Sequence, residues 1–466
     1  MVAIAALCLL LPSTAAAHGL SGPRSLPIPE WLFAWAAAIV LVVSFVALSV
    51  LWPRPRLAAL AAGRSVAVPQ AVRTVGRVVL GALGVAIWGV VIWAGLTGTS
   101  NVQANIAPTM VYVGFWVGIP VLALFVGDLW RVLSPWRAIA EAAAWLGERI
   151  AGSGNLPRPM PYPERAGLIP AALVLLSFGW LELAAPNRDD PAVLAIVALV
   201  YGAAMLIGAS VYGIRFLDQA DGFAQYFRLA GSLAPLRWHE GRLHVRWPGT
   251  GLVEVRPERG LAAVVLVLIG ITTFDGLAGG ELWNNDGAIG PWLEDIFLGL
   301  GLEITAADVV ARTLGMLVVV GIIWGFVWVG ILGIHRVDPT RHTPRELLGR
   351  FAPTLAPIAI GYAVAHYCSL LAQGGQSLGF LLSDPRGTGA NWFGTADWGV
   401  DYGLLTGNGT WYVQVAALVL GHVAGLVAAH DLALRTFRGP RAAARSQYWM
   451  LAVMVGFTSL GLWLLS

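Results

Sequence analysis

The sequence contains no lysine, and all 29 of its basic residues are arginine. Charged residues make up only 12% of the 466 residues, whereas a soluble protein carries about a quarter. The net charge of +3 gives no indication of a nucleic-acid partner. Hydrophobic residues account for 57% of the chain, and the mean hydropathy is +0.72. These values predict a polytopic membrane protein whose main partner is the lipid bilayer.

Cysteine and the common catalytic motifs are also scarce. The two cysteines, Cys8 in the first apolar stretch and Cys368 within a later one, differ too much in role to suggest a disulfide or a thiolate metal site. The sequence has no P-loop, HExxH or CxxC motif and no GxSxG nucleophile elbow, because its GxSxG string at 375–379 does not follow a predicted strand. No short motif therefore identifies a nucleotide, zinc, dithiol or serine-hydrolase chemistry.

The first stretch, "MVAIAALCLLLPSTAAAHG", is too short to span a bilayer and ends in small residues. Ala15 and Ala17 fit an A-x-A cleavage pattern, which predicts a signal peptide at 1–17 and a single transmembrane domain at 18–466. Cleavage would leave His18 at the N-terminus, where an amine and an imidazole together can chelate copper. An incidental histidine is the commoner explanation.

Ten later segments are each apolar over the length that a membrane-spanning helix requires, about 20 residues. They are Trp31–Trp52, Val75–Thr97, Pro108–Trp130, Ala166–Ala185, Ala192–Phe216, Leu261–Gly279, Val309–Ile334, Phe351–Leu371, Trp411–Leu434 and Tyr448–Leu465. The predicted fold class is therefore all-α, a polytopic transmembrane helix bundle of about ten spans.

The arginines predict how these spans are oriented. Of the 29, 25 lie in alternate connecting segments, which the positive-inside rule assigns to the cytoplasm. Both mature termini then lie outside the inner (plasma) membrane, with outer loops at 280–308 and 374–410 and a cytoplasmic loop at 217–258. Within that cytoplasmic loop, "RLHVRWPGTGLVEVRP" alternates around Pro-Gly-Thr-Gly and predicts a small β-hairpin. The segment "SPWRAIAEAAAWLGERIAG" predicts an amphipathic helix at the inner surface.

Ionisable residues within the spans are candidates for function, because they cost free energy in hydrocarbon unless they are used or paired. His422 falls near the middle of its span and His366 slightly toward the outer side. Asp275, Glu182 and Arg312 fall in the outer halves of theirs. A cluster of these residues opening toward the outside is geometrically possible.

Each candidate also has a structural interpretation. A neutral imidazole that hydrogen-bonds a neighbouring helix would explain His366 or His422 about as well as a functional role does. For Asp275 and Arg312, an ion pair between adjacent helices is the favoured interpretation.

Two pairs near the predicted inner surface are interpreted as structural. His430 and Asp431 are interpreted as a helix-end pair close to the lipid headgroups. Asp128 and Arg131 are interpreted as anchoring residues.

Five stretches together resemble actinobacterial multi-pass membrane proteins of the family named fenitrothion hydrolase. They are "LPIPEWLFAWAAAIVLVVSFVAL", "FVGDLWRVLSPWRAI", "AGLIPAALVLLSFGWLELAAP", "AHYCSLLAQGGQSLGFLLSDPRGTG" and "WYVQVAALVLGHVAGLVAAHDLALRTF". The resemblance covers almost the whole chain and implies cleavage of an organophosphate triester by water. His366, His422 and Asp275 would then be the catalytic candidates.

Two classes of function fit the same residues, and a third rests on the N-terminus. In a hydrolase, a divalent metal held by His366, His422 and Glu182 would activate water. In a secondary transporter or permease, the intramembrane histidines would relay protons or ions for an unknown small solute. A copper-handling or scaffold protein would instead use His18. The hydrolase requires both histidines and a carboxylate to converge on one metal-sized site.

Overall fold

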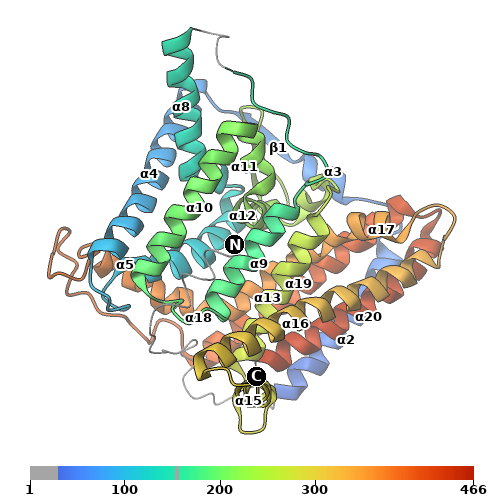
Figure 1. Cartoon of the computed structure of the whole chain (residues 1–466). Coiled ribbons are helices and arrows are strands. Elements are labelled where there is room, and N and C mark those ends of the chain that lie inside the picture. Colours follow the sequence, from blue (N-terminus) through green and yellow to red (C-terminus); the bar gives the residue numbers. More distant parts are fainter. Residues whose placement is uncertain (1–29, 153–156, 466) are drawn as a thin grey trace.

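A computed structural model describes residues 30–152 and 157–465. The predicted signal peptide at 1–17 and His18 lie outside the described residues. The described chain is mostly helical and includes one small three-stranded sheet (Figure 1). This confirms the predicted all-α bundle with a small hairpin.

A helix occupies each of the ten predicted spans. These helices are α2 (Glu30–Leu51), α4 (Gln70–Thr97), the continuous segment of α5 (Ile106–Thr109), η1 (Met110–Gly118) and α6 (Ile119–Val126), α9 (Ile169–Leu183), α10 (Pro191–Tyr212), α13 (Leu261–Gly279), α16 (Ile304–His335), α18 (Ala356–Leu381), α19 (Gly407–Thr436) and α20 (Pro440–Leu465). Among the described residues, seven helical segments are long and apolar enough to cross a membrane, and Trp35–Leu51 and Ile169–Leu183 are shorter apolar helices. The chain is therefore a helical membrane protein by length and composition.

Shorter elements connect the long helices. They are α3 (Leu57–Ala62), α7 (Trp130–Leu133), α8 (Pro135–Ala151), α11 (Ile214–Ala220), α12 (Gly222–Ser232), α14 (Glu281–Asn284), α15 (Ile289–Gly299), α17 (Pro344–Phe351) and the 3-10 helices η2 (Thr250–Glu254) and η3 (Ala352–Leu355). Helix α8 is the predicted amphipathic helix, and the Ser134 side chain caps it by accepting from the backbone N–H of Arg137.

The sheet contains the predicted hairpin with its turn in a different place. Strands β2 (Leu236–His239) and β3 (Arg242–Val245) pair through a turn at Glu240 and Gly241, which have φ of 48° and 76°. Such positive φ values are those of the tight two-residue hairpin turn. The Pro-Gly-Thr-Gly stretch leads into η2 instead, so its assignment as the turn was wrong. Strand β1 (Arg64–Ala67) joins the other edge of β3 and gives the order β1-β3-β2.

Helix α13 lies at the centre of the bundle, and most of its residues are buried. It packs against α9, α16 and α18. Gly179 of α9 lies against Ile271, and Gly270 lies against Val320 of α16; an added Cβ would approach those side chains to 2.9 and 2.6 Å. Small residues allow this close approach of helices. The end of α13 that carries Asp275 is therefore enclosed by neighbouring helices.

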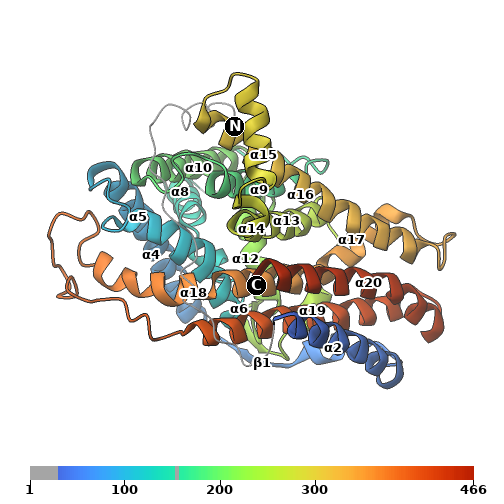
Figure 2. The same cartoon turned by 90° about the horizontal axis from the view of Figure 1, so that it is seen from below.

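Helix α12 packs into the bundle, although its sequence lies within the predicted cytoplasmic loop at 217–258. Nine of its eleven residues are buried, among them Phe223, Tyr226 and Phe227. It contacts α6 and α9, and Figure 2 shows it between the layer of α10, α9 and α13 and the layer of α18, α19 and α20. This segment is therefore part of the helical core.

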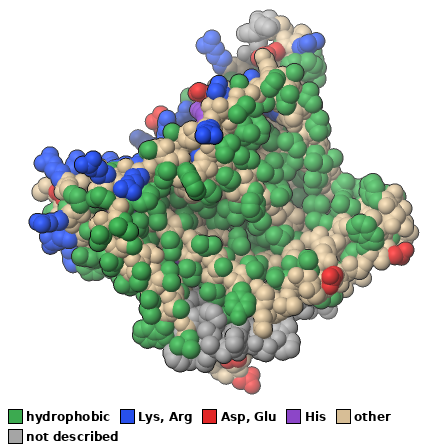
Figure 3. Space-filling view, turned by 180° about the vertical axis from the view of Figure 1, so that it is seen from behind, with side chains coloured by type: hydrophobic (Ala, Val, Ile, Leu, Met, Phe, Trp, Pro, Cys, Tyr) green, Lys and Arg blue, Asp and Glu red, His purple; other side chains and the backbone are tan. Residues whose placement is uncertain are grey.

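The surface divides into an apolar part and an arginine-rich part. Figure 3 shows hydrophobic side chains covering most of one face, with basic side chains along one edge and acidic ones at the opposite end. An apolar belt between polar ends is the arrangement expected of a bilayer-embedded bundle.

Candidate functional site

Asp275 and His366 form the centre of the candidate site. Asp275 is buried near the end of α13, and His366 lies on α18, which packs against it. The imidazole Nε2 of His366 is 2.8 Å from Oδ2 of Asp275. The histidine side chain keeps 21% of its surface accessible, against 7% for the aspartate. The carboxylate is thus enclosed, and the imidazole connects it to the surface of the protein.

Tyr367 extends this contact to a second carboxyl group. Its hydroxyl is 2.7 Å from Oδ2 of Asp275 and 3.4 Å from Oε1 of Glu182, which is 3% exposed on α9. Four side chains from α9, α13 and α18 therefore form one continuous set of polar contacts, here called the proton network: Glu182, Asp275, His366 and Tyr367.

Hydrogen counting shows what the proton network can hold. A tyrosine hydroxyl has one hydrogen, which it donates over the shorter contact to Asp275. The contact with Glu182 then becomes a hydrogen bond only when the Glu182 carboxyl carries a proton and donates it to the tyrosine oxygen. The arrangement can therefore bind a proton at one carboxyl and share it along the chain of four groups.

Aromatic rings fix the orientation of the imidazole. The ring of Tyr362, one helical turn earlier on α18, stacks on His366 with centroids 5.9 Å apart and 9° between the planes. The Tyr367 ring meets the imidazole edge-on at 4.8 Å. Nearby Thr272 and Thr273 donate to carbonyls of their own helix and so do not compete for Asp275.

His422 does not belong to this network. Its Nδ1 is 2.7 Å from the carbonyl of Leu418 on its own helix, and its buried Nε2 has no hydrogen-bond partner among the described residues. Next to it, Gly421 packs on the carbonyl of Pro357, and Gly361 packs on the carbonyl of Ala417.

The close crossing of α18 and α19 at Gly361 and Gly421 shows how far apart His422 and His366 lie along the helix axes. His366 lies five residues beyond Gly361, or roughly 7 Å further along the axis of α18. His422 lies beside the crossing itself. In the described part of the chain, no three His, Cys, Asp or Glu side chains form a group that could hold a metal ion. The ligand set His366, His422 and Glu182 thus gains no support from this arrangement.

Arg312 has a different partner from the predicted one. Its Nε lies 2.6 Å from Oδ1 of Asp308, one turn earlier on α16. Asp275 instead contacts His366 and Tyr367. The interpretation of Asp275 and Arg312 as an inter-helix ion pair was wrong, because α16 presents the arginine to its own acidic neighbour.

His430 and Asp431 are buried and do more than end a helix. Asp431 accepts from the backbone N–H groups of Arg56 and Leu57, at 2.6 and 3.1 Å, and also pairs with Arg435. His430 Nε2 lies 3.1 Å from the carbonyl of Trp52. The pair fastens the connection between α2 and α3 to α19.

Tyr367 was missed among the candidates, although the sequence contained a signal for it. A tyrosine within an apolar helix needs a partner for its hydroxyl when it is buried. Its place directly after His366, in "AHYC", put the two polar groups on adjoining parts of the helix surface.

Comparison of the chain with protein-family models, with curated proteins and with solved structures finds no match. The resemblance to the fenitrothion hydrolase family therefore stays a prediction from the sequence.

Proposed function

We propose that the chain is a proton-coupled membrane transporter and that the proton network is its proton-binding site. The observation that carries the proposal is the 2.8 Å contact between His366 and Asp275, linked through Tyr367 to Glu182. Histidine and carboxyl groups within membrane helices are typical of proton relays.

The position of the network explains how a proton would act on the fold. Its members come from α13 at the centre of the bundle and from α9 and α18, which both pack on α13. Adding or removing a proton changes which group donates in each contact, and hence how strongly the three helices are held together. A difference of this kind between two protonation states can shift a conformational equilibrium.

The metal-dependent hydrolase considered from the family resemblance would need a set of metal ligands that the described residues do not form. A metal-activated water needs three or more ligands around one ion. His366 pairs with Asp275, whereas His422 bonds within α19. The transporter proposal uses the contacts that His366 does make.

The distribution of arginine supports a proposed orientation. We place the arginine-rich segments, including α8 and the sheet, on the cytoplasmic side of the plasma membrane by the positive-inside rule. With ten spans, both ends of the mature chain then lie outside, and α15 and the segment 382–406 face outward. The proton network lies toward that outer side.

Transport can be tested with the full chain in liposomes that hold a pH-sensitive dye. Classes of small solute, including amino acids, sugars, nucleosides and metal cations, are added one at a time across a pH gradient. We expect one class to drive proton movement in the wild type, with loss in Asp275→Asn and His366→Gln. Asp308→Asn is the matched control, because Asp308 lies on α16 outside the network and should leave the flux unchanged.

The same preparation separates the two functions. Release of nitrophenol from fenitrothion, together with no solute-driven proton movement, would contradict the transporter and favour the hydrolase. Proton movement that persists unchanged in Asp275→Asn would show that another site carries the proton.

A further inference from the structure

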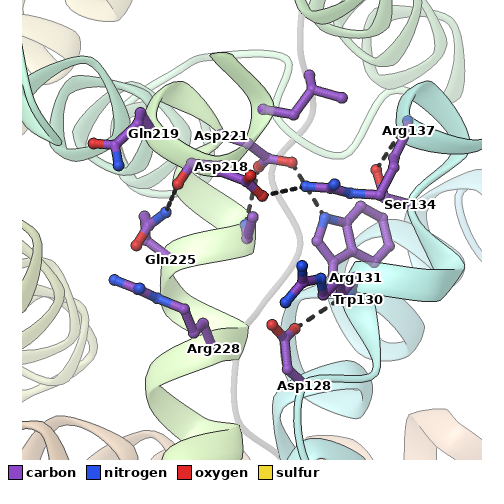
Figure 4. Close-up of a pocket in the computed structure, with 12 residues that line it drawn as sticks. Asp128, Trp130, Arg131, Ser134, Arg137, Asp218, Gln219, Asp221, Gln225 and Arg228 are labelled. Carbon is purple, nitrogen blue, oxygen red and sulfur yellow. Dashed lines mark hydrogen bonds and ion pairs between the residues drawn. The ribbon is translucent and has the colours of Figure 1, made fainter. Parts of the chain in front are cut away.

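A second polar site lies where α7, α8, α11 and α12 meet, on the arginine-rich side of the bundle. It is a cavity of about 250 Å³ (Figure 4). Its wall includes three arginines and three aspartates: Arg131, Arg137, Arg228, Asp128, Asp218 and Asp221. It shares no residue with the proton network.

Several of these charges are already occupied by the fold. Arg137 Nη2 contacts Oδ1 of Asp218 at 2.5 Å. Asp221 accepts from the Tyr201 hydroxyl at 2.9 Å and from the Trp136 indole at 2.8 Å, and it also caps α12. These groups shape the cavity and need no ligand.

Two side chains on α12 are not satisfied in this way. Gln225 is 1% exposed; its Nε2 donates to the carbonyl of Asp218, but its buried Oε1 has no partner among the described residues. The buried Nε and Nη2 of Arg228 likewise make no hydrogen bond to any described residue, and Nη1 lies 3.7 Å from Glu258. Figure 4 shows both side chains projecting from the same side of α12. The cavity wall thus offers unused donors and an unused acceptor.

Asp128 approaches from the other side of the cavity, next to Arg131 (Figure 4). Its Oδ1 accepts from the backbone N–H of Arg131 at 3.3 Å, a long contact that leaves acceptor capacity on the carboxyl group. A second acceptor for a hydrogen-bond donor is therefore present.

These groups define the chemistry of a ligand. Arg228 calls for an anionic acceptor such as phosphate, which the planar guanidinium binds well. Gln225 Oε1 and Asp128 each require a hydrogen-bond donor, which an anion without an O–H group, such as sulfate, does not have. The unused donors of Arg228 and the unused acceptor of Gln225 together favour a ligand that carries both an anionic group and a hydrogen-bond donor. The cavity is smaller than the ~300–1,000 Å³ of sites for drug-sized molecules, which suits a small polar group.

We propose that this cavity binds phosphoethanolamine, with the phosphate on Arg228 and the ammonium on Gln225 Oε1. Gln225 and Arg228 are three residues apart on one helix, with Cβ atoms roughly 5–6 Å apart, so a two-carbon linker can bridge them. The group can come from a phospholipid headgroup of the adjoining bilayer or from the free compound in water.

Binding to the purified full chain in detergent tests the proposal. The probes are short-chain phosphatidylethanolamine, phosphatidylglycerol, phosphatidylcholine and free phosphoethanolamine, each titrated by microscale thermophoresis. We expect the ethanolamine lipid to bind about tenfold more tightly than the other two lipids, which lack a donating ammonium. If free phosphoethanolamine binds as tightly as the lipid, the ligand is the free compound. If only the probe with acyl chains binds, the ligand is the phospholipid headgroup.

Variants locate the site. Arg228→Gln and Gln225→Leu should each weaken binding of the ethanolamine lipid by about tenfold. Arg215→Gln is the matched control, since Arg215 lies on α11 outside the cavity wall and should bind as the wild type does. If Arg228→Gln does not fold, the preference of the wild-type protein among the three lipid headgroups still tests the proposal. Equal binding of the three lipids, no binding of any ethanolamine probe, or wild-type affinity in both cavity variants would overturn the proposal.

Discussion

Asp275 is the side chain that contacts both His366 and Tyr367. Replacing it with alanine removes the acceptor of the imidazole nitrogen and the closer of the two acceptors of the Tyr367 hydroxyl. Breaking a buried pair in this way typically costs about 3–5 kcal/mol. We expect Asp275→Ala to lower the free energy of unfolding by that amount in detergent. Asp308→Ala, which removes a half-exposed ion pair on α16, should cost about 1 kcal/mol or less. Equal losses in the two variants would contradict the proposed contacts.

The Asp128 carboxyl makes the free energy of unfolding depend on pH. Burial of its carboxyl raises its pKa above the ordinary value of 3.8, and the N–H and charge of Arg131 offset this only in part. A raised pKa means that the folded chain holds this proton more tightly than the unfolded chain does. The free energy of unfolding therefore falls as pH rises above about 3.8 toward the folded pKa. We expect Asp128→Asn to raise the Tm at pH 7, with the gain vanishing near pH 3.8.

The control for Asp128 is Asp286→Asn, which alters an exposed carboxyl and should change the free energy of unfolding by about 0.5 kcal/mol or less. Thermal unfolding is followed in detergent without added phospholipid. A Tm for Asp128→Asn that equals the wild-type value at neutral pH would show that the carboxyl is well solvated.

Individual site residues were predictable from the sequence only as candidates. Glu182, Asp275 and His366 were selected because ionisable groups are rare in membrane helices. Which way each one faces was not predictable, because these helices are apolar on nearly every side and show no hydrophobic face from which to fix a rotation. The fold brings these three together and leaves out Arg312 and His422.

At the scale of elements, Asp431 fastens the connection between α2 and α3 to α19. Its carboxylate accepts from the N–H groups of Arg56 and Leu57 and from the indole of Trp52. Asp431→Ala leaves these donors unsatisfied, at about 1–3 kcal/mol for a buried group. We expect faster hydrogen exchange at Arg56 and Leu57, with a smaller effect in Asp431→Asn, which keeps one acceptor oxygen. Unchanged exchange in Asp431→Ala would mean that water replaces the carboxylate.

The crossing of α18 and α19 depends on glycine. A Cβ at Gly361 would lie 2.7 Å from the carbonyl oxygen of Ala417, so the backbones must separate. We expect Gly361→Ala to destabilise the protein by about 1–3 kcal/mol, the usual cost of overpacking. Gly325 on α16 has open space around it, and Gly325→Ala should be neutral or stabilise by up to about 1 kcal/mol. Equal free energies of unfolding for Gly361→Ala and Gly325→Ala would contradict the close crossing of α18 and α19.

Most elements followed from the sequence because long apolar runs and caps act locally. The segment "GFAQYFRLAGS" of α12 did not, since it is short and its glutamine and arginine separate it from the long apolar runs that indicate spans. Burial of this helix arises from contacts with α6 and α9, which lie far from it in the sequence. The hairpin was predicted, but its turn lies at Glu240 and Gly241. Both residues have the positive φ that a two-residue hairpin turn requires.

For the whole molecule, the proposed orientation is open to a direct test. Alkaline phosphatase is active only outside the cytoplasm, so we expect activity for a fusion at the C-terminus. A fusion after Ala151, at the end of α8, should be inactive, because the arginine-rich side is placed in the cytoplasm. Fluorescent-protein fusions at the same two positions should give the opposite pattern. Activity after Ala151 without activity at the C-terminus would invert the topology.

The most direct test of the proton network is nitrogen NMR of histidine-labelled protein in lipid bilayers. The His366 ring signals are identified by their loss in His366→Gln. We predict that the chemical shifts of these signals change as the pH is varied over the range in which the protein stays folded. Asp275→Asn should displace that change. His366 signals that stay constant over this range in folded protein, or that titrate identically in Asp275→Asn, would contradict a proton shared between the two residues.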